Sequence, residues 1–87
     1  MESYSVSIKA SAAKELGALP TLKDRQRAVA LIRGLAIEPR PQGCIKLAGT
    51  NDAYRVRFGS YRILYSISDG VRVVSIERIA HRREAYR

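Results

Sequence analysis

The sequence predicts one α+β domain in which two helices cover one face of a sheet. Three observations indicate this class: an alternating segment near the N-terminus, helical periodicity over residues 11–38, and strongly alternating segments from residue 54 onward. The chain has 87 residues, a length that suits one compact core. We therefore expect residues 1–87 to form a single domain with an N-terminal strand, a helical hairpin, and three to four antiparallel strands in one sheet.

The first two elements are predicted in residues 4–19. In the segment YSVSIK (residues 4–9), apolar and polar side chains alternate, as in a half-buried strand. Residues 11–19 are rich in helix-forming residues, and Ser11 is a suitable N-cap. Pro20 is expected to end this helix, because a residue that precedes proline disfavours the helical conformation.

A second helix is predicted between Thr21 and Pro39. Thr21 and Asp24 form a variant of the capping box at its start. Apolar side chains then recur at helical spacing as far as Leu35, while basic and polar side chains occupy the other face. The apolar face of this helix is expected to cover one side of the sheet.

The second half of the chain carries the strand patterns. The segment CIKLAG (residues 44–49) suits a short strand, and residues 54–58 and 61–67 alternate strictly on either side of a Gly-Ser turn. Ser68–Gly70 predicts a hairpin turn. Residues 71–80 are mostly apolar on both faces, which is typical of a central strand.

Alternation divides residues 54–67 into an apolar face and a basic face. The apolar face, which is expected to pack against the helices, comprises Tyr54, Val56, Phe58, Tyr61, Ile63, Tyr65 and Ile67. The opposite face carries Arg55, Arg57 and Arg62, which cross-strand pairing brings together. Such a cluster is either a solvated outer face or a phosphate site, because a guanidinium group presents a planar fork to phosphate oxygens. Alternation alone leaves both interpretations open.

The overall charge narrows the class of partner. Sixteen Lys and Arg residues stand against eight Asp and Glu, which gives a net charge of +8 and a pI near 10.3. Such a surface attracts polyanions, so we expect nucleic acid first, then an acidic protein, and a membrane surface third. Cys44 is the single cysteine, which excludes an intramolecular disulfide and suits a reducing cytosol. No apolar run reaches about 18 residues, so we expect a cytoplasmic protein without a membrane span.

The last predicted strand is followed by the segment HRREAYR (residues 81–87). We expect His81, Arg82, Arg83 and Tyr86 to line the same cleft as the strand arginines. A histidine can carry a proton near neutral pH, and a tyrosine can stack on a base. The alternative for His81 is an ordinary surface position, and for Tyr86 it is a packing or cation–π contact with an arginine.

The ordered set of motifs resembles the RelE-type toxins of bacterial toxin–antitoxin pairs, within the RelE/ParE superfamily. The resemblance rests on KLAG, YRVRFGSYRILYSI and VVSIERIAHRREAYR, together with PRPQGCIKL in the first half, so it covers nearly the whole chain. It implies a ribosome-dependent endoribonuclease that cuts messenger RNA in the A site. In that reaction the ribose 2′-OH attacks the adjacent phosphodiester and leaves a 2′,3′-cyclic phosphate and a free 5′-OH. The resemblance implies no metal and no cofactor.

The resemblance also implies roles for individual residues. Arg62 and Arg82 match positions that hold the scissile phosphate, and Tyr86 matches a tyrosine that stacks on or orients the substrate. Arg55 and Arg57 match basic residues, often lysines, that lie near the attacking hydroxyl. Because arginine hardly ever loses its proton, it is a poor general base, and His81 is the expected proton carrier. The expected catalytic set is thus Arg57, Arg62, His81, Arg82 and Tyr86, with Lys46, Arg55, Arg83 and Arg87 as RNA-binding residues.

Partners follow from the same resemblance. We expect a cognate antitoxin protein, the 70S ribosome with its messenger RNA, and operator DNA only as part of the toxin–antitoxin complex. One alternative is a ParE-like poison of DNA gyrase without nuclease chemistry. Another is a non-catalytic basic domain whose arginines only bind an acidic antitoxin or nucleic acid.

Overall fold

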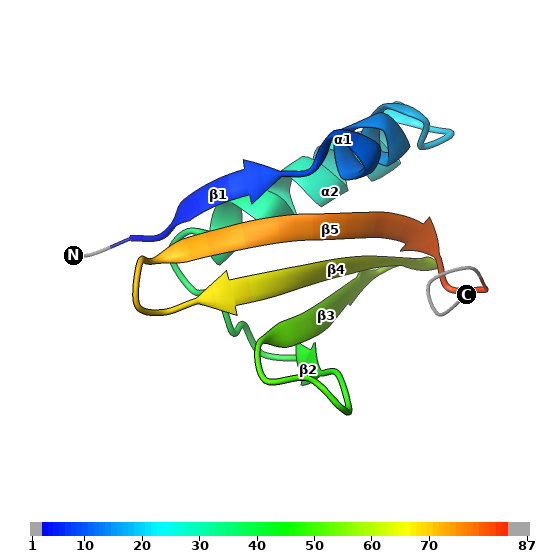
Figure 1. The fold of residues 1–87 in the computed structure, drawn as a ribbon. Coiled ribbons are helices and arrows are strands. Elements are labelled where there is room, and N and C mark those ends of the chain that lie inside the picture. The colour runs from blue at the N-terminus through cyan, green and yellow to red at the C-terminus, as the bar shows by residue number, and fades with distance from the viewer. Residues whose placement is uncertain (1–2, 84–87) are drawn as a thin grey trace.

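The computed structural model describes residues 3–83 and contains one five-stranded sheet with two helices on one face (Figure 1). The elements are β1 (Ser5–Ile8), α1 (Ala10–Gly17), α2 (Leu22–Leu35), β2 (Ile45–Lys46), β3 (Ala53–Phe58), β4 (Tyr61–Ser68) and β5 (Val73–His81). The strand order is β1-β5-β4-β3-β2. The predicted α+β architecture is therefore confirmed.

Strand β5 lies between two other strands, as its mostly apolar sequence predicts. It pairs in parallel with β1 on one side and antiparallel with β4 on the other. Val74 and Ile76 have no exposed surface. The pairing of β1 with β5 brings the first strand of the chain against the last, and the two helices that follow β1 cover one face of the sheet (Figure 1).

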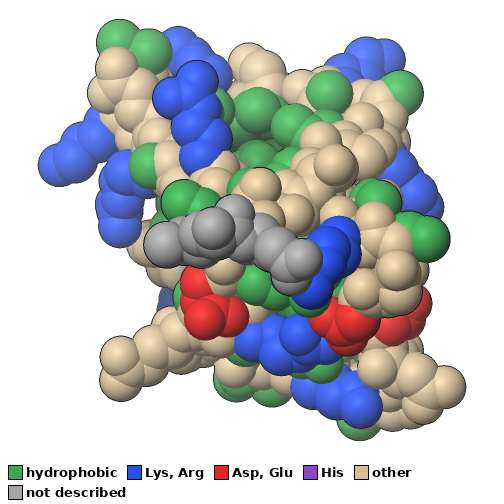
Figure 2. Space-filling model, turned by 90° about the vertical axis from the view of Figure 1, so that its left-hand side faces the viewer, with side chains coloured by type: hydrophobic (Ala, Val, Ile, Leu, Met, Phe, Trp, Pro, Cys, Tyr) green, Lys and Arg blue, Asp and Glu red, His purple; other side chains and the backbone are tan. Residues whose placement is uncertain are grey.

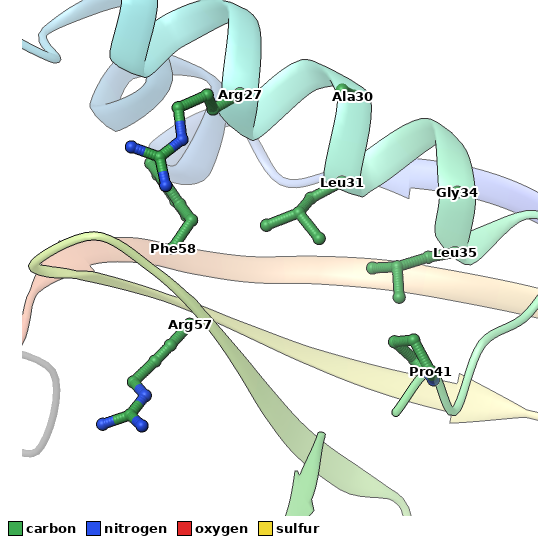
Figure 3. A pocket seen from close by; sticks show the side chains of 8 residues that line it. All are labelled: Arg27, Ala30, Leu31, Gly34, Leu35, Pro41, Arg57 and Phe58. Carbon is green, nitrogen blue, oxygen red and sulfur yellow. The ribbon is translucent and has the colours of Figure 1, made fainter. Parts of the chain in front are cut away.

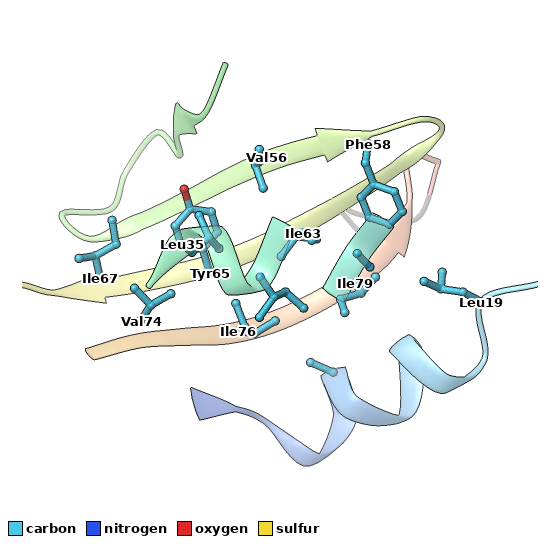
Figure 4. Close-up of a cluster of buried hydrophobic side chains, with 13 residues drawn as sticks. Leu19, Leu35, Val56, Phe58, Ile63, Tyr65, Ile67, Val74, Ile76 and Ile79 are labelled. Atoms are coloured by element: carbon cyan, nitrogen blue, oxygen red, sulfur yellow. The ribbon is translucent and has the colours of Figure 1, made fainter. Parts of the chain in front are cut away.

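The core lies between the helices and one face of the sheet (Figure 4). The sheet contributes Val56, Phe58, Ile63, Tyr65, Ile67, Val74, Ile76 and Ile79, and the helices and their connection contribute Ala12, Leu19, Ala28, Ile32 and Leu35. The apolar face that alternation predicts is thus the core face, with Tyr54 and Tyr61 packed at its margin. Burial of each large aliphatic or aromatic side chain stabilises the fold by about 1.5–3 kcal/mol relative to exposure.

The helix ends agree with the sequence in one case and differ in the other. At the start of α2, the Asp24 N–H donates to Thr21 Oγ1 at 3.0 Å, so the predicted N-cap is confirmed. The prediction of Ser11 as the N-cap of α1 is wrong, because α1 begins at Ala10 and its N-cap, Lys9, makes no side-chain capping bond. Neither helix in the described part of the chain is long and apolar enough for a membrane span.

The two hairpin turns also differ in how well sequence predicts them. The turn after β3 is formed by Gly59 and Ser60, as predicted, and Gly59 has a φ of 54° that suits glycine. The turn after β4 was predicted at Ser68–Gly70, but Ser68 still pairs with Val73 inside the sheet. The connection runs over residues 69–72 instead, and Arg72 rather than glycine takes the positive φ, at 56°.

A one-residue bulge interrupts the pairing of β4 with β5. Tyr65 pairs with Ile76, whereas the preceding residue, Leu64, pairs with Arg78, so Glu77 has no partner across the ladder. An extra residue of this kind reverses the alternation of every later side chain in the strand. It places Ile79 opposite Ile63 in the core, where Ile79 is only 2% exposed.

Candidate functional site

Arginine side chains from two neighbouring strands meet on the sheet face opposite the helices. Arg57 of β3 and Arg62 of β4 are direct cross-strand partners, and Arg55 lies two residues earlier on the same face, opposite Leu64. Cβ atoms of such partners lie roughly 4.5–5.5 Å apart. The Arg57 side chain extends away from α2, while its neighbour Phe58 points towards that helix (Figure 3). The predicted common face of the three arginines is confirmed, and we call it the arginine face.

Arg62 is the most unusual residue of the arginine face. It is 9% exposed, and its Nε atom is buried without a hydrogen-bond partner among residues 3–83. A buried charge is costly unless it is paired and hydrogen-bonded, and the adjacent guanidinium group of Arg57 adds repulsion. An anion bound between Arg57 and Arg62 would offset both costs, because carboxylate and phosphate oxygens accept bidentate bonds from arginine.

One carboxylate of β5, Glu77, is engaged by other residues. Glu77 forms a salt bridge with Lys9 and accepts a hydrogen bond from Ser66 Oγ at 3.3 Å. The hydrogen bond from Lys9 is the main reason that the pKa of Glu77 lies below its usual value. In the described residues 3–83, no three His, Cys, Asp or Glu side chains are grouped to hold a metal ion.

The arginine face continues to the edge of the sheet. A hollow of about 120 Å³ lies between β2 and β3, lined by Gly43, Ile45, Arg55 and Arg57. Lys46, predicted to bind RNA with these arginines, pairs instead with Tyr54, whose ring stacks on Tyr65 of the core. Register therefore places Lys46 on the helix side of the sheet, apart from the arginine face.

The chain beyond β5 returns to the arginine face at Arg82. Its backbone N–H donates to the carbonyl oxygen of Ser60 at 2.8 Å, which extends the β4–β5 ladder past the pair Arg62 and Ala80. Strand alternation therefore assigns Arg82 to the same face as Arg62. Arg83 is exposed, and its N–H donates to His81 Nδ1 at 3.3 Å. Tyr86 and Arg87 lie outside the described residues.

His81 does not share the arginine face. It pairs with Tyr61, and the two rings meet edge to face with centroids 5.6 Å apart. Its other neighbours around a shallow hollow include Leu19 and Pro20 of the helical hairpin. The expectation that His81 lines the same cleft as the strand arginines is therefore wrong. The physical reason is the bulge, which sets the face on which each residue after Glu77 emerges.

A groove lies between α2 and β3 on the helix side of the molecule (Figure 3). Its volume is about 510 Å³, and its floor is apolar, with Leu31, Leu35 and Phe58 pointing into it. Arg27 and Arg57 also line it. On the side of the molecule shown in Figure 2, Lys and Arg side chains lie around much of the outline, and apolar side chains are exposed between them. The sequence analysis missed this groove, because helical periodicity does not show which apolar side chains stay uncovered.

A second arginine cluster, which the sequence analysis also missed, lies at the other end of β4. Arg40 donates to both carboxylate oxygens of Asp69, at 2.8 and 3.3 Å, and to the Tyr54 hydroxyl at 3.1 Å. The Tyr4 hydroxyl donates to the same carboxylate at 2.6 Å. The bonds from Arg40 and then from Tyr4 lower the pKa of Asp69 to about 2. This cluster joins the N-terminal segment, the loop after α2 and the β4–β5 turn.

A family model and a relative of known family both match this chain over nearly its whole length. The family model described as the ParE toxin of the type II toxin-antitoxin system, parDE, matches residues 6–86. The RelE1 protein of Methanocaldococcus jannaschii is 30% identical over 87 residues, which cover 97% of this chain and 96% of that protein.

Solved structures with the same fold include toxin–antitoxin complexes. The archaeal RelE–RelB complex from Pyrococcus horikoshii contains a chain that is 34% identical, with a TM-score of 0.82 and coverage of 94% of this chain and 98% of that chain. A chain of the RelBE2 complex from Mycobacterium tuberculosis is 28% identical, with a TM-score of 0.78 and coverage of 91% and 98%. The chain therefore belongs to the RelE/ParE family of toxins from type II toxin–antitoxin systems.

Proposed function

We propose that this toxin is an endoribonuclease that cuts messenger RNA in the ribosomal A site, in the cytoplasm, without a metal ion. The observation that carries the proposal is the buried Arg62, whose Nε has no hydrogen-bond partner in the described part of the chain and whose cross-strand neighbour is Arg57. A backbone phosphate supplies the anion that this pair lacks. The basic charge of the whole chain draws the toxin towards RNA.

The proposed reaction begins when the ribose 2′-oxygen attacks the adjacent phosphorus. The bond from this oxygen to phosphorus forms, the bond from phosphorus to the 5′-oxygen breaks, and the products are a 2′,3′-cyclic phosphate and a 5′-hydroxyl. Negative charge grows on the phosphoryl oxygens during the attack. Guanidinium groups fixed in advance stabilise that charge, and one such donor is typically worth roughly 10²–10³ in rate. Arg57 and Arg62 hold the phosphate, and Arg82 approaches from the end of β5.

The arginine face contains no side chain suited to proton transfer among its three arginines. The 2′-OH must lose a proton and the 5′-oxygen must gain one, but arginine hardly ever gives up its proton. The structure directs His81 to the other side of the sheet, against Tyr61. The proposal therefore assigns the transition-state charge to the arginines, and proton transfer to water or to groups of the ribosome.

We also propose a protein antitoxin as the silencing partner. The solved relatives include RelE–RelB complexes, and this chain offers the apolar groove, which Arg27 borders. An antitoxin segment with apolar and acidic side chains suits that groove. Raised salt should weaken the complex, because screening reduces attraction between exposed charges, and an affinity independent of salt would contradict the electrostatic part of the proposal.

Mapping messenger ends on translating ribosomes tests the nuclease proposal. The wild-type toxin should produce new 5′-hydroxyl ends within the A-site codon, and Arg57→Ala with Arg62→Ala should produce none above background. Lys23→Ala, on the exposed part of α2, is the matched control and should cleave normally. Intact messenger in the presence of wild-type toxin would refute the proposal.

The family model supports one other activity. Because the matching model is that of the ParE toxin, the second candidate is a poison of DNA gyrase. That activity predicts gyrase-linked DNA breaks and intact messenger in the same cells. A chain that only binds its antitoxin or operator DNA would produce neither lesion and would not inhibit growth.

A further inference from the structure

We propose that Glu15 of α1 is a positioning residue, which fixes the register of β5 and so holds Arg82 on the arginine face. The inference rests on the proposed function for its catalytic consequence. It rests on the bulge in β5 and on the contacts of Glu15 for its structural content. Glu15 belongs to neither the predicted site nor the arginine face.

The bulge determines which residues of the β5 end meet Arg62. Before the bulge, Tyr65 pairs with Ile76 and Ser66 with Ser75; after it, Arg62 pairs with Ala80. If the earlier register continued without the bulge, Arg62 would face Ile79 instead. A shift of one residue moves every side chain to the opposite face of the sheet, so Arg82 would leave the arginine face.

Glu15 contacts β5 immediately after the unpaired residue. Its Oε1 atom accepts a hydrogen bond from the backbone N–H of Ile79 at 2.9 Å. Its Oε2 atom lies 3.5 Å from Nε of Arg78. Both carboxylate oxygens therefore bind the first two residues of the shifted register.

At Ile79, the edge of β5 that pairs with β1 earlier in the strand has no strand beside it among the described residues. The pairing with β1 ends at Ile8 and Ile76, and the Lys9 N–H then donates to the Ile76 carbonyl at 3.0 Å. Glu15 thus takes the role of a strand partner for the Ile79 N–H, which would otherwise be a partly buried donor without an acceptor. A slip back to the earlier register would cost the Glu15 contacts as well as the burial of Ile79.

Three variants separate positioning from general stability. Glu15→Ala removes the acceptor, whereas Glu15→Gln keeps an oxygen that can accept the Ile79 N–H. Thr21→Ala removes the N-cap of α2 and serves as a control that lowers stability without touching β5. Each full-length variant is assayed for messenger cleavage at saturating ribosomes and for thermal unfolding.

The register itself is read by NMR, without reference to activity. The His81 and Tyr61 rings, 5.6 Å apart, should give cross-relaxation signals only in the shifted register. Glu15→Ala should weaken these signals, speed hydrogen exchange of the Ile79 amide, and lower kcat by about tenfold, within the range for a mispositioned catalytic group. Glu15→Gln should restore most of all three, and Thr21→Ala should leave the ring signals unchanged.

The outcomes divide cleanly. Unchanged ring signals and cleavage in folded Glu15→Ala would overturn the inference. So would a loss of cleavage no larger than that of an equally destabilised Thr21→Ala. If the wild-type toxin cleaves no messenger, the proposed function fails, and the ring signals and the Ile79 amide still decide whether Glu15 sets the register.

Discussion

Two arginine clusters at opposite ends of the same sheet differ in where their anion comes from. Arg40 donates hydrogen bonds to both carboxylate oxygens of Asp69 and to the Tyr54 hydroxyl, so its partners lie within the chain. Arg62 is more deeply buried, yet its Nε finds no hydrogen-bond partner in the residues that the structure describes, and its cross-strand neighbour is another arginine. The first cluster is paired within the chain, whereas the proposed function assigns an external anion, the RNA phosphate, to the second.

This difference separates a stabilising arginine from a functional one. Buried polar groups in folded proteins nearly always find partners, and exceptions concentrate where function requires them. Arg40 joins three segments of the chain at the surface. The proposed function predicts that Arg62, held in place by the strands around it, costs stability until a phosphate binds.

The largest expected effect comes from Arg62→Met, which removes the guanidinium group proposed to bind the phosphate. Cleavage should fall by roughly 10²–10³, while the free energy of unfolding should stay the same or rise, because an apolar side chain replaces a buried unpaired charge. Ribosome-based cleavage and urea unfolding measure the two quantities. Arg40→Met is the matched control and should show the reverse pattern, with normal cleavage and reduced stability. A marked loss of stability in Arg62→Met would show that its charge is already satisfied.

A smaller effect is expected from Tyr65→Phe, which lies next to the cluster of Arg40, Asp69, Tyr4 and Tyr54. The Tyr65 side chain is fully buried, and its hydroxyl donates to the Pro39 carbonyl at 2.8 Å, beside Arg40. Removing the hydroxyl should lower the free energy of unfolding by about 1–2 kcal/mol, since it leaves that carbonyl without this donor. Chemical denaturation measures the change, and cleavage should remain normal. An unchanged midpoint would show that this bond contributes nothing to stability.

The smallest expected effect is the pH dependence of the stability that Asp69 contributes through its bonds with Arg40 and Tyr4. The pKa of Asp69 is about 2 in the folded chain, against 3.8 for the free side chain. The unfolded state therefore binds more protons between these values, so the contribution of Asp69 is complete above about pH 4 and is lost as the pH falls towards 2. Asp69→Asn should remove this part of the acid sensitivity. Superimposable acid unfolding curves for the variant and the wild type would contradict the assignment.

Local sequence pattern predicted much of the fold. The period-2 alternation of residues 54–67 indicated both the core face and the arginine face, because successive side chains of a strand point to opposite sides. The N-cap of α2 at Thr21 was predictable for a similarly local reason, because the Thr21 hydroxyl oxygen accepts a hydrogen bond from an N–H only three residues away.

The features that sequence could not predict depend on distant contacts. The bulge at Glu77 lies where two adjacent charged residues, Glu77 and Arg78, interrupt the apolar pattern of the strand, so alternation does not carry over to the later residues. It sends His81 to the face opposite the one expected. Glu15 meets Ile79 across 64 positions, and Arg40 meets Asp69 across 29. Such partners become visible only once the chain has folded.

The central claim is that Arg57 and Arg62 form an anion site that the chain leaves open for RNA. NMR of arginine Nε–H groups, with a short RNA that carries a 2′-deoxy sugar at the cleavage position, tests this most directly. The Arg62 Nε–H signal should shift on addition of the RNA, while that of Arg40 stays in place because the Tyr54 hydroxyl already accepts its hydrogen bond. Bound RNA with an unmoved Arg62 signal, or equal shifts at both arginines, would contradict the account.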